Sequence, residues 1–147
     1  MIQTSNEIFI GASAEKIFSF AAATDRWPVI LPHYRYVRVL AGDEHTRTLQ
    51  MSAWRTMIPV QWTAQQWNDP QKPSIHFRHI AGWTKGMEVE WRFEPRRDGT
   101  LVTIIHNLEF QFPFAADTIG KHIVSDFFVH DIAGKTLARI KQLAEHA

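Results

Sequence analysis

The spacing of apolar residues divides the chain into helical and strand-like segments. Residues 3–10 alternate weakly between apolar and polar positions and predict a first strand. The following segment, AEKIFSFAA, places its apolar residues on one helical face, and Ser13 just before it is a suitable N-cap. Residues 24–32, TDRWPVILP, predict a second short helix, which Thr24 or Asp25 would cap and a proline would end.

After residue 33 the pattern becomes that of strands, separated by turn sequences such as RRDG. The six predicted strands cover residues 34–42, 45–54, 58–67, 74–80, 86–95 and 100–112. Residues 117–144 then have helical spacing. This order predicts an α+β fold, in which a curved antiparallel seven-stranded sheet surrounds a long C-terminal helix and two short helices follow the first strand.

Alternation along the strands predicts which side chains face inward. The clearest case is residues 86–95, where Met87, Val89, Trp91 and Phe93 share one face and charged residues occupy the other. On four other strands the same rule puts a polar residue on an otherwise apolar face: Gln66 after Trp62, His79 after Phe77, His106 after Ile104 and Arg55 after Met51. These are either ordinary polar residues at the edge of a core or functional groups of a cavity. Several on one wall are more than chance predicts, because buried polar groups are costly without partners.

Length and charge limit the class of protein. A chain of 147 residues, 45% of them hydrophobic, predicts one domain over residues 1–147 with a real core. The net charge of +1 favours neither a nucleic acid nor a membrane as partner. Neither a signal-peptide pattern nor an apolar run of about 20 residues is present, so we expect a cytoplasmic protein without a transmembrane segment, as a monomer or homodimer.

Several kinds of chemistry have no motif in the sequence. The absence of cysteine excludes disulfides, thiol nucleophiles and zinc–thiolate sites. The eight histidines form no HExxH motif, no GxSxG elbow occurs, and the glycines form no phosphate-binding loop, so we predict neither a metal nor a cofactor. The stretch HYRYVR is basic and aromatic, but alternation divides it between two faces of a strand, which does not suit nucleic-acid binding.

Aromatic content is the unusual feature of the composition. Six tryptophans and ten phenylalanines occur in this short chain. Large aromatic side chains can fill a core, and they also line apolar ligand pockets. Composition leaves both alternatives open.

Four segments, taken in order, resemble a known family. They are W-P-x-x-x-P-x-Y (Trp27, Pro28, Pro32, Tyr34), GMEVEWRF, GTLVTIIHNLEF and RIKQLAE. Over nearly the whole chain the sequence resembles the START-like superfamily with its helix-grip fold, and most closely the aromatic polyketide cyclases/aromatases of the tetracenomycin type. The resemblance implies an internal cavity for a hydrophobic, aromatic or polycyclic molecule. It also implies aldol cyclisation and dehydration of a poly-keto substrate, without a cofactor, and an acyl carrier protein as a candidate partner.

The resemblance also suggests which residues act on the ligand. In the tetracenomycin-type enzyme an arginine four residues after a strand tryptophan polarises the polyketone. Here that tryptophan corresponds to Trp62 and the arginine to Gln66, which can donate a hydrogen bond but cannot act as an acid. The catalytic candidates are therefore Tyr34, His106 and Gln66, with histidines of ordinary pKa near 6.5 as proton shuttles. The predicted ligand-binding residues are Trp27, Leu31, Arg55, Trp62, Phe77, His79, Met87, Trp91, Phe110 and Phe127.

Two other functions fit the same sequence. A non-catalytic carrier of a lipid or quinone, like the Coq10 proteins, would have the same cavity without convergent proton donors. A protein-interaction module would instead have a cavity filled by its own aromatic side chains and an exposed apolar patch.

Overall fold

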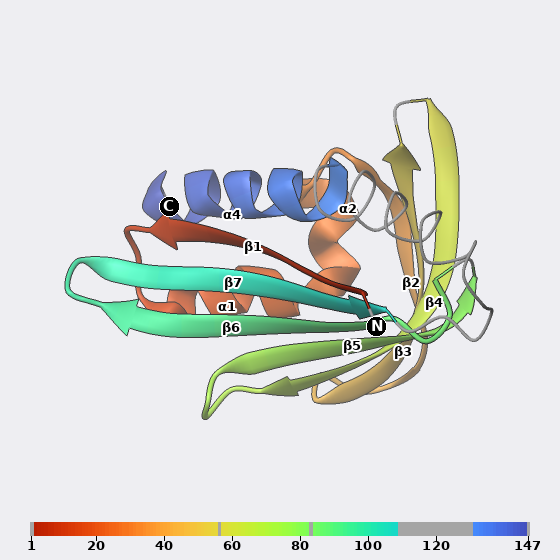
Figure 1. Cartoon of the computed structure of the whole chain (residues 1–147), viewed down its shortest axis with the longest axis horizontal. Coiled ribbons are helices and arrows are strands. Elements are labelled where there is room, and N and C mark those ends of the chain that lie inside the picture. The colour runs from red at the N-terminus through yellow and green to blue at the C-terminus, as the bar shows by residue number, and fades with distance from the viewer. Residues whose placement is uncertain (1, 56, 83, 109–130, 147) are drawn as a thin grey trace.

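The computed structural model describes residues 2–55, 57–82, 84–108 and 131–146. Within them, seven antiparallel strands form one sheet, and helices lie against it (Figure 1). The strands are β1 (Ile2–Ile10), β2 (Tyr34–Gly42), β3 (Thr46–Arg55), β4 (Ile58–Asp69), β5 (Ser74–Gly82), β6 (Glu88–Arg96) and β7 (Gly99–Leu108). The helices are α1 (Ala14–Ala22), the 3₁₀ turn η1 (Thr24–Arg26), α2 (Trp27–Ile30) and α4 (Gly134–His146). This architecture confirms the fold predicted from the sequence.

The strand order is β1-β7-β6-β5-β4-β3-β2. Strands β2 to β7 follow one another as neighbours, while β1 lies beside β7, so α1, η1 and α2 carry the chain from one edge of the sheet to the other. Register shifts interrupt the pairing of β2 with β3 and of β4 with β5. Such irregularities increase local bending and twist, and Figure 1 shows β2–β4 turned sharply away from β5–β7.

The C-terminal helix packs on the inner side of this sheet. Leu137, Ile140 and Ala144 of α4 are buried in the main core, and α4 contacts both β1 and α1. The part of the predicted helix in residues 117–130 lies outside the described residues. No helix in the described part of the chain has the length and apolar character needed to cross a membrane.

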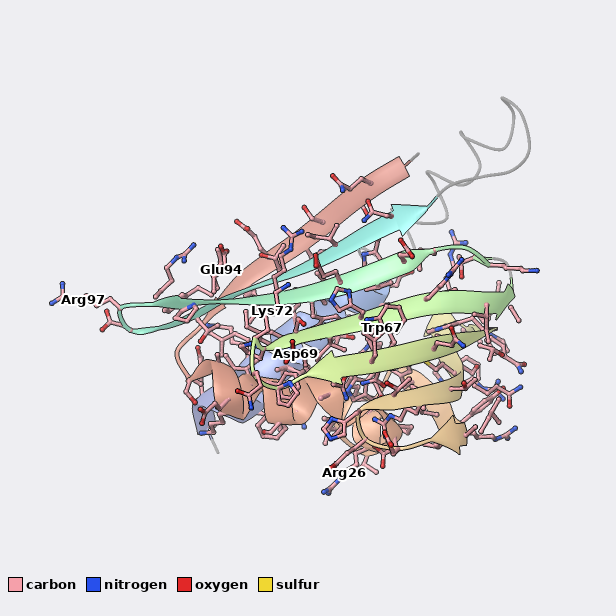
Figure 2. All side chains as sticks on the ribbon, turned by 90° about the horizontal axis from the view of Figure 1, so that it is seen from below. Arg26, Trp67, Asp69, Lys72, Glu94 and Arg97 are labelled. Carbon is pink, nitrogen blue, oxygen red and sulfur yellow. The ribbon has the colours of Figure 1, made fainter. Side chains whose placement is uncertain are left out.

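The two faces of the sheet follow the alternation seen in the sequence. Met87, Val89, Trp91 and Phe93 are all buried, which confirms the inner face predicted for residues 86–95. The opposite face is turned to solvent. Figure 2 shows this outer face, with Trp67 projecting from β4 on the side away from the helices.

Ser13 caps α1 as predicted, because its hydroxyl accepts a hydrogen bond from the Lys16 N–H. The capping predicted for the second helix is wrong. Neither η1 nor α2 has a side-chain cap. Instead, the Thr24 hydroxyl donates to the Gln66 side chain and Asp25 pairs with Arg47, so both side chains join the short helices to the sheet.

Replacing Ser13 by alanine should remove this cap and lower the free energy of unfolding by about 1 kcal/mol. Ser19→Ala is the matched control, because Ser19 lies within the same helix and donates to the Lys16 carbonyl without capping a free N–H. We expect this control to be neutral or slightly stabilising, since alanine has the higher helix propensity. Urea denaturation of both variants tests the difference, and equal losses of stability would contradict it.

Candidate functional site

An internal cavity lies between the inner face of the sheet, α2 and the beginning of the C-terminal helical region. Its free volume is about 40 Å³. The lining is mostly aromatic and aliphatic, with a few polar groups. The described lining residues are Trp27, Tyr34, Met51, Trp62, Phe77, His79, Val89, Trp91, Ile104, His106, Ile132, Ala133 and Thr136.

Trp27 is at the centre of the aromatic cluster around this cavity. Its ring centroid lies 5.1 Å from that of Tyr34, 6.0 Å from Phe77 and 6.1 Å from Trp91. The indole N–H donates to the Phe20 carbonyl at 3.3 Å. One side chain from a four-residue helix therefore contacts three strands and is fixed to the end of α1.

Two buried histidines, one on β5 and one on β7, provide polar groups on the sheet side of the cavity. His79 stacks on Trp62 with ring centroids 5.7 Å apart and planes only 3° from parallel. Its Nδ1 is hydrogen-bonded to the buried Thr84 hydroxyl at 2.6 Å, which fixes the ring. His106 lies on β7 and is equally buried, and each histidine would repel a proton on the other.

The pKa values of these groups differ from the sequence-based expectation. Burial lowers the pKa of His106 to about 4, so the expected value near 6.5 is wrong. Burial, followed by repulsion from His106, lowers the pKa of His79 to about 3. Burial also raises the pKa of Tyr34. At neutral pH these three side chains are uncharged, because water that would stabilise their ions is excluded.

His33 links this wall to the C-terminal helix. Its Nε2 lies 3.0 Å from the Thr136 hydroxyl of α4, and its ring packs 5.0 Å from that of Tyr34. Burial, together with the nearby Lys135, lowers the pKa of His33 to about 4. The neutral imidazole thus holds α4, β2 and the Tyr34 ring together at one side of the cavity.

The structure brings seven of the predicted site residues together around the cavity: Trp27, Tyr34, Trp62, Phe77, His79, Trp91 and His106. Leu31 and Met87 are buried in the core but are not among the residues that line the cavity. Arg55 is half-buried at the end of β3, also away from the lining. Phe110 and Phe127 lie outside the described residues.

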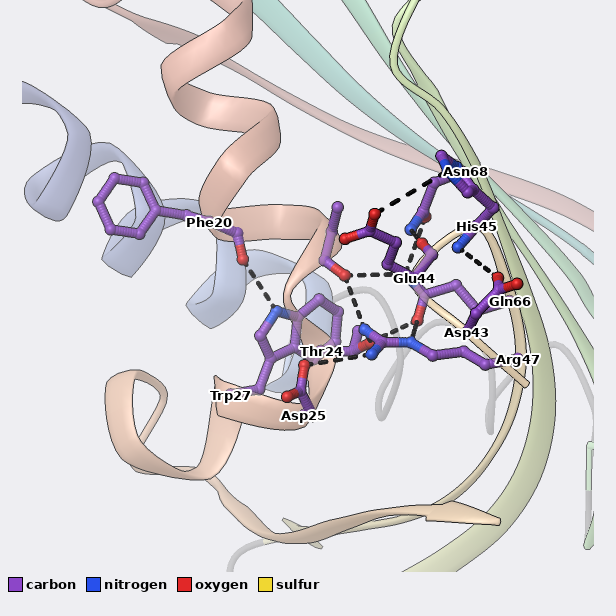
Figure 3. A network of polar contacts seen from close by, with 11 residues as sticks. Phe20, Thr24, Asp25, Trp27, Asp43, Glu44, His45, Arg47, Gln66 and Asn68 are labelled. Atoms are coloured by element: carbon purple, nitrogen blue, oxygen red, sulfur yellow. Dashed lines mark hydrogen bonds and ion pairs between the residues drawn. The ribbon is translucent and has the colours of Figure 1, made fainter. Parts of the chain in front are cut away.

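Gln66 has a different environment from Tyr34 and His106. It is buried, but it is absent from the cavity lining. Its amide donates to the Ala22 carbonyl at 3.1 Å, and its carbonyl oxygen accepts from the Thr24 hydroxyl and from Arg47 Nε (Figure 3). Arg47 also contacts Asp25 at 3.2 Å. These bonds join η1 to β3 and β4. The side-chain amide of Gln66 is therefore engaged in structural hydrogen bonds.

Sequence reasoning left six lining residues out of the site. Strand alternation predicts Met51, Val89 and Ile104 on the inner faces of their strands, and this signal is sufficient to identify them. Ile132 lies within residues 117–144, whose helical spacing predicts an apolar face that includes it. Ala133 and Thr136 had no comparable signal, since their position depends on how the helix sits over the sheet.

A second hollow of about 460 Å³ lies at one end of the sheet. It is bounded by α1, by the turn between β2 and β3 and by the turn between β4 and β5. Its charged residues include Arg47 and Asp25, which pair with each other. All described residues that line the internal cavity are buried, whereas none that lines this hollow is, so the internal cavity is the better candidate for a ligand. Among the described residues, no group of three or more His, Asp or Glu side chains could hold a metal ion.

Comparison with known proteins places the fold and cavity in a family. The profile of the family described as "Polyketide cyclase / dehydrase and lipid transport" matches residues 10–125. The chain belongs to this family. A Streptomyces cyaneus protein, named provisionally as a polyketide cyclase, is 27% identical over 104 residues, which cover 66% of this chain and 66% of that protein.

Solved structures share the same fold. The Zhui aromatase/cyclase from Streptomyces sp. R1128 superposes with a TM-score of 0.83 at 15% identity, covering 98% of this chain and 93% of that chain. A START superfamily protein from Mycobacterium smegmatis superposes with a TM-score of 0.73 at 17% identity, covering 96% of this chain and 98% of that chain. The helix-grip fold expected from the sequence is thereby confirmed.

The buried histidines predict how stability depends on pH. A histidine with a folded-state pKa of about 4, against 6.5 in the unfolded chain, binds its proton first in the unfolded state. The stability of the folded state that depends on a neutral histidine is therefore complete above pH 6.5 and is lost as the pH falls toward 4. We expect the free energy of unfolding to fall by up to about 1.4 kcal/mol per pH unit for each such histidine.

His106→Asn should reduce the change in the free energy of unfolding per pH unit by up to the contribution of one histidine. This holds whatever the substitution does to stability at neutral pH. Urea denaturation at several pH values between 6.5 and 5 measures the slope before most carboxylates titrate. Above pH 7 the curves of the wild type and the variant should run parallel. An unchanged slope in His106→Asn would contradict a buried, neutral His106.

Proposed function

We propose that residues 1–147 form a single ligand-binding domain, which takes an uncharged hydrophobic molecule, aromatic or polycyclic, into the internal cavity. The observation that supports this most directly is the character of the walls. They combine stacked aromatic rings with Tyr34, His79 and His106, all neutral at physiological pH. Such groups can hydrogen-bond carbonyl or hydroxyl oxygens. A carboxylate there would lose its hydration and would find no counter-ion among the described lining residues.

The size of the cavity adds a requirement. About 40 Å³ is room for only a few water molecules, whereas pockets for drug-sized ligands have about 300–1,000 Å³. Ligand binding must therefore displace side chains of the aromatic cluster. The smallness also fits the expectation that aromatic side chains can fill the cavity when no ligand is bound.

For the reaction, we propose the cyclisation and dehydration of a poly-keto chain, which an acyl carrier protein would deliver. A carbon between two carbonyl groups loses a proton to an imidazole of His106 or His79 and attacks a second carbonyl carbon of the chain. The oxygen of that carbonyl takes a proton from the Tyr34 hydroxyl and becomes an alcohol. Tyr34 regains its proton from the imidazolium. The carbon that attacked then gives its second proton to the neutral imidazole, and the imidazolium passes this proton to the hydroxyl, which leaves as water and yields a carbon–carbon double bond.

A non-catalytic carrier is the second candidate, and the histidine environment favours it. A group with a pKa of about 3 to 4 is a weak base at neutral pH, so the described lining has no residue poised near that pH for proton transfer. The description of the family includes lipid transport beside cyclisation. Both candidates share the binding step and differ only in what happens to the ligand afterwards.

Binding can be tested with 1-naphthol and 1-naphthoate, two probes of similar size of which only the second is charged at pH 7. We expect naphthol to quench tryptophan fluorescence with an affinity at least about ten-fold higher, because the described residues of the lining offer no cation to the carboxylate. Equal affinities, or tighter binding of naphthoate, would contradict the proposed neutral site.

Variants locate this binding. His106→Ala and Tyr34→Phe should each weaken naphthol binding by about three-fold to ten-fold, the value of one hydrogen bond. His76→Ala is the matched control, since His76 lies on the outer face and stacks on Trp67. Loss of binding in the control, or no loss in either cavity variant, would place the ligand elsewhere.

A poly-β-keto thioester analogue separates the enzyme from the carrier. A cyclase converts it to a product lighter by one water, and the Tyr34→Phe variant should lose at least about ten-fold of this rate while still binding. A carrier binds the analogue and returns it at unchanged mass. Mass spectrometry of the released compound distinguishes the two, and bound analogue released unchanged would reject the enzymatic proposal.

A further inference from the structure

The tip of the β3–β4 hairpin exposes large apolar side chains that the cavity does not account for. Met57 is 89% exposed and Ile58 63% exposed, and Trp54 next to them is 38% exposed. Figure 1 shows this hairpin standing out above the other elements at the upper right. The strands continue for about 13 Å beyond the cavity, measured from the Met51–Trp62 pair in its lining to the Arg55–Ile58 pair at the tip. The tip therefore projects well beyond the cavity.

The charged residues of β2 and of the parts of β3 and β4 that lead to this tip are basic. Residues 33–42, 48–67 and 74–87 contain five basic residues and no Asp or Glu, although the whole chain has fifteen acidic residues. The net charge of +1 conceals this asymmetry. Two of the five, Arg35 and Arg38, are exposed on β2. Arg55 and Arg35 lie nearest the tip, because Arg55 pairs with Ile58 and Arg35 follows Tyr34, which pairs with Ala53.

Arginine and aromatic side chains are stacked beside the tip. The Arg35 guanidinium lies 5.0 Å from the Trp54 ring centroid and 5.5 Å from that of Tyr36. The Arg38 guanidinium lies 4.1 Å from the Tyr36 centroid. An amphipathic ring under a cation is the arrangement that suits the boundary between lipid headgroups and acyl chains.

We propose that this surface, formed by Trp54, Met57 and Ile58 with Arg35 and Arg55, docks on a bilayer that contains anionic lipid. The aliphatic tip enters the headgroup region and the arginines contact lipid phosphates. A projecting tip with so few side chains suits shallow insertion. It is narrow for a protein interface, which typically buries about 800 Å² on each partner. The proposal is independent of any reaction in the cavity, and its test uses no cavity ligand.

Vesicle flotation tests the proposal with phosphatidylcholine vesicles, with and without phosphatidylglycerol. The wild type should float only with the anionic vesicles, and raised salt should weaken this binding. The double variant Met57→Asp/Ile58→Asp should reduce the bound fraction by more than about ten-fold. Because both side chains are exposed, this variant should fold, which its thermal unfolding can verify.

Val39→Asp/Leu40→Asp is the matched control. These residues are also exposed aliphatics, 46% and 57%, and the change in charge is the same, but they lie toward the other end of β2. The control should lose no more than about three-fold of the binding. Absence of binding, equal binding to neutral vesicles, or equal losses in both double variants would overturn the proposal. A tip variant that changes only the oligomeric state would assign the tip to contacts between two copies of the chain and would overturn it too.

Discussion

The packing of Trp27 is the contact on which the arrangement of the cavity depends. A helix of four residues cannot be stable alone, because helix formation needs more turns to offset its nucleation cost. Its position is instead fixed by one large ring, which contacts Tyr34, Phe77 and Trp91. Pro28 follows in the first turn of α2, where a proline costs no hydrogen bond. The aromatic, proline-bracketed segment after α1 therefore closes one side of the cavity.

Burial of the polar side chains in this interior determines what chemistry is available there. Burial keeps His33, His79 and His106 neutral. One of them, His79, also stacks flat on Trp62. Neutral imidazole can donate and accept hydrogen bonds, so it can bind an oxygenated ligand without a charge. The same burial, by lowering the pKa, makes the imidazole a weak base at neutral pH. Membership of the polyketide cyclase/dehydrase and lipid transport family is compatible with either outcome, which is why binding and turnover are separate questions.

Local patterns predicted the parts of the structure that depend on local physics. Alternation identified the inner face of β6, and the serine before α1 identified its cap. The environment of Gln66 could not be predicted in this way. It depends on η1 packing against the sheet and on a β3–β4 register that pairs Gln66 with Arg47. The histidine pKa values likewise follow from burial by distant elements, and the contact of His33 with Thr136 joins residues 103 positions apart.

The central claim is that an uncharged aromatic molecule enters the interior and displaces the aromatic side chains that fill it. An isotope-filtered NOE experiment on the complex with 1-naphthol tests this claim directly. The account predicts NOEs from naphthol protons to the methyl groups of Met51, Ile104 and Ile132, which line the cavity. NOEs only to exposed methyl groups such as those of Val29 or Met57 would contradict it, because the ligand would then lie on the surface.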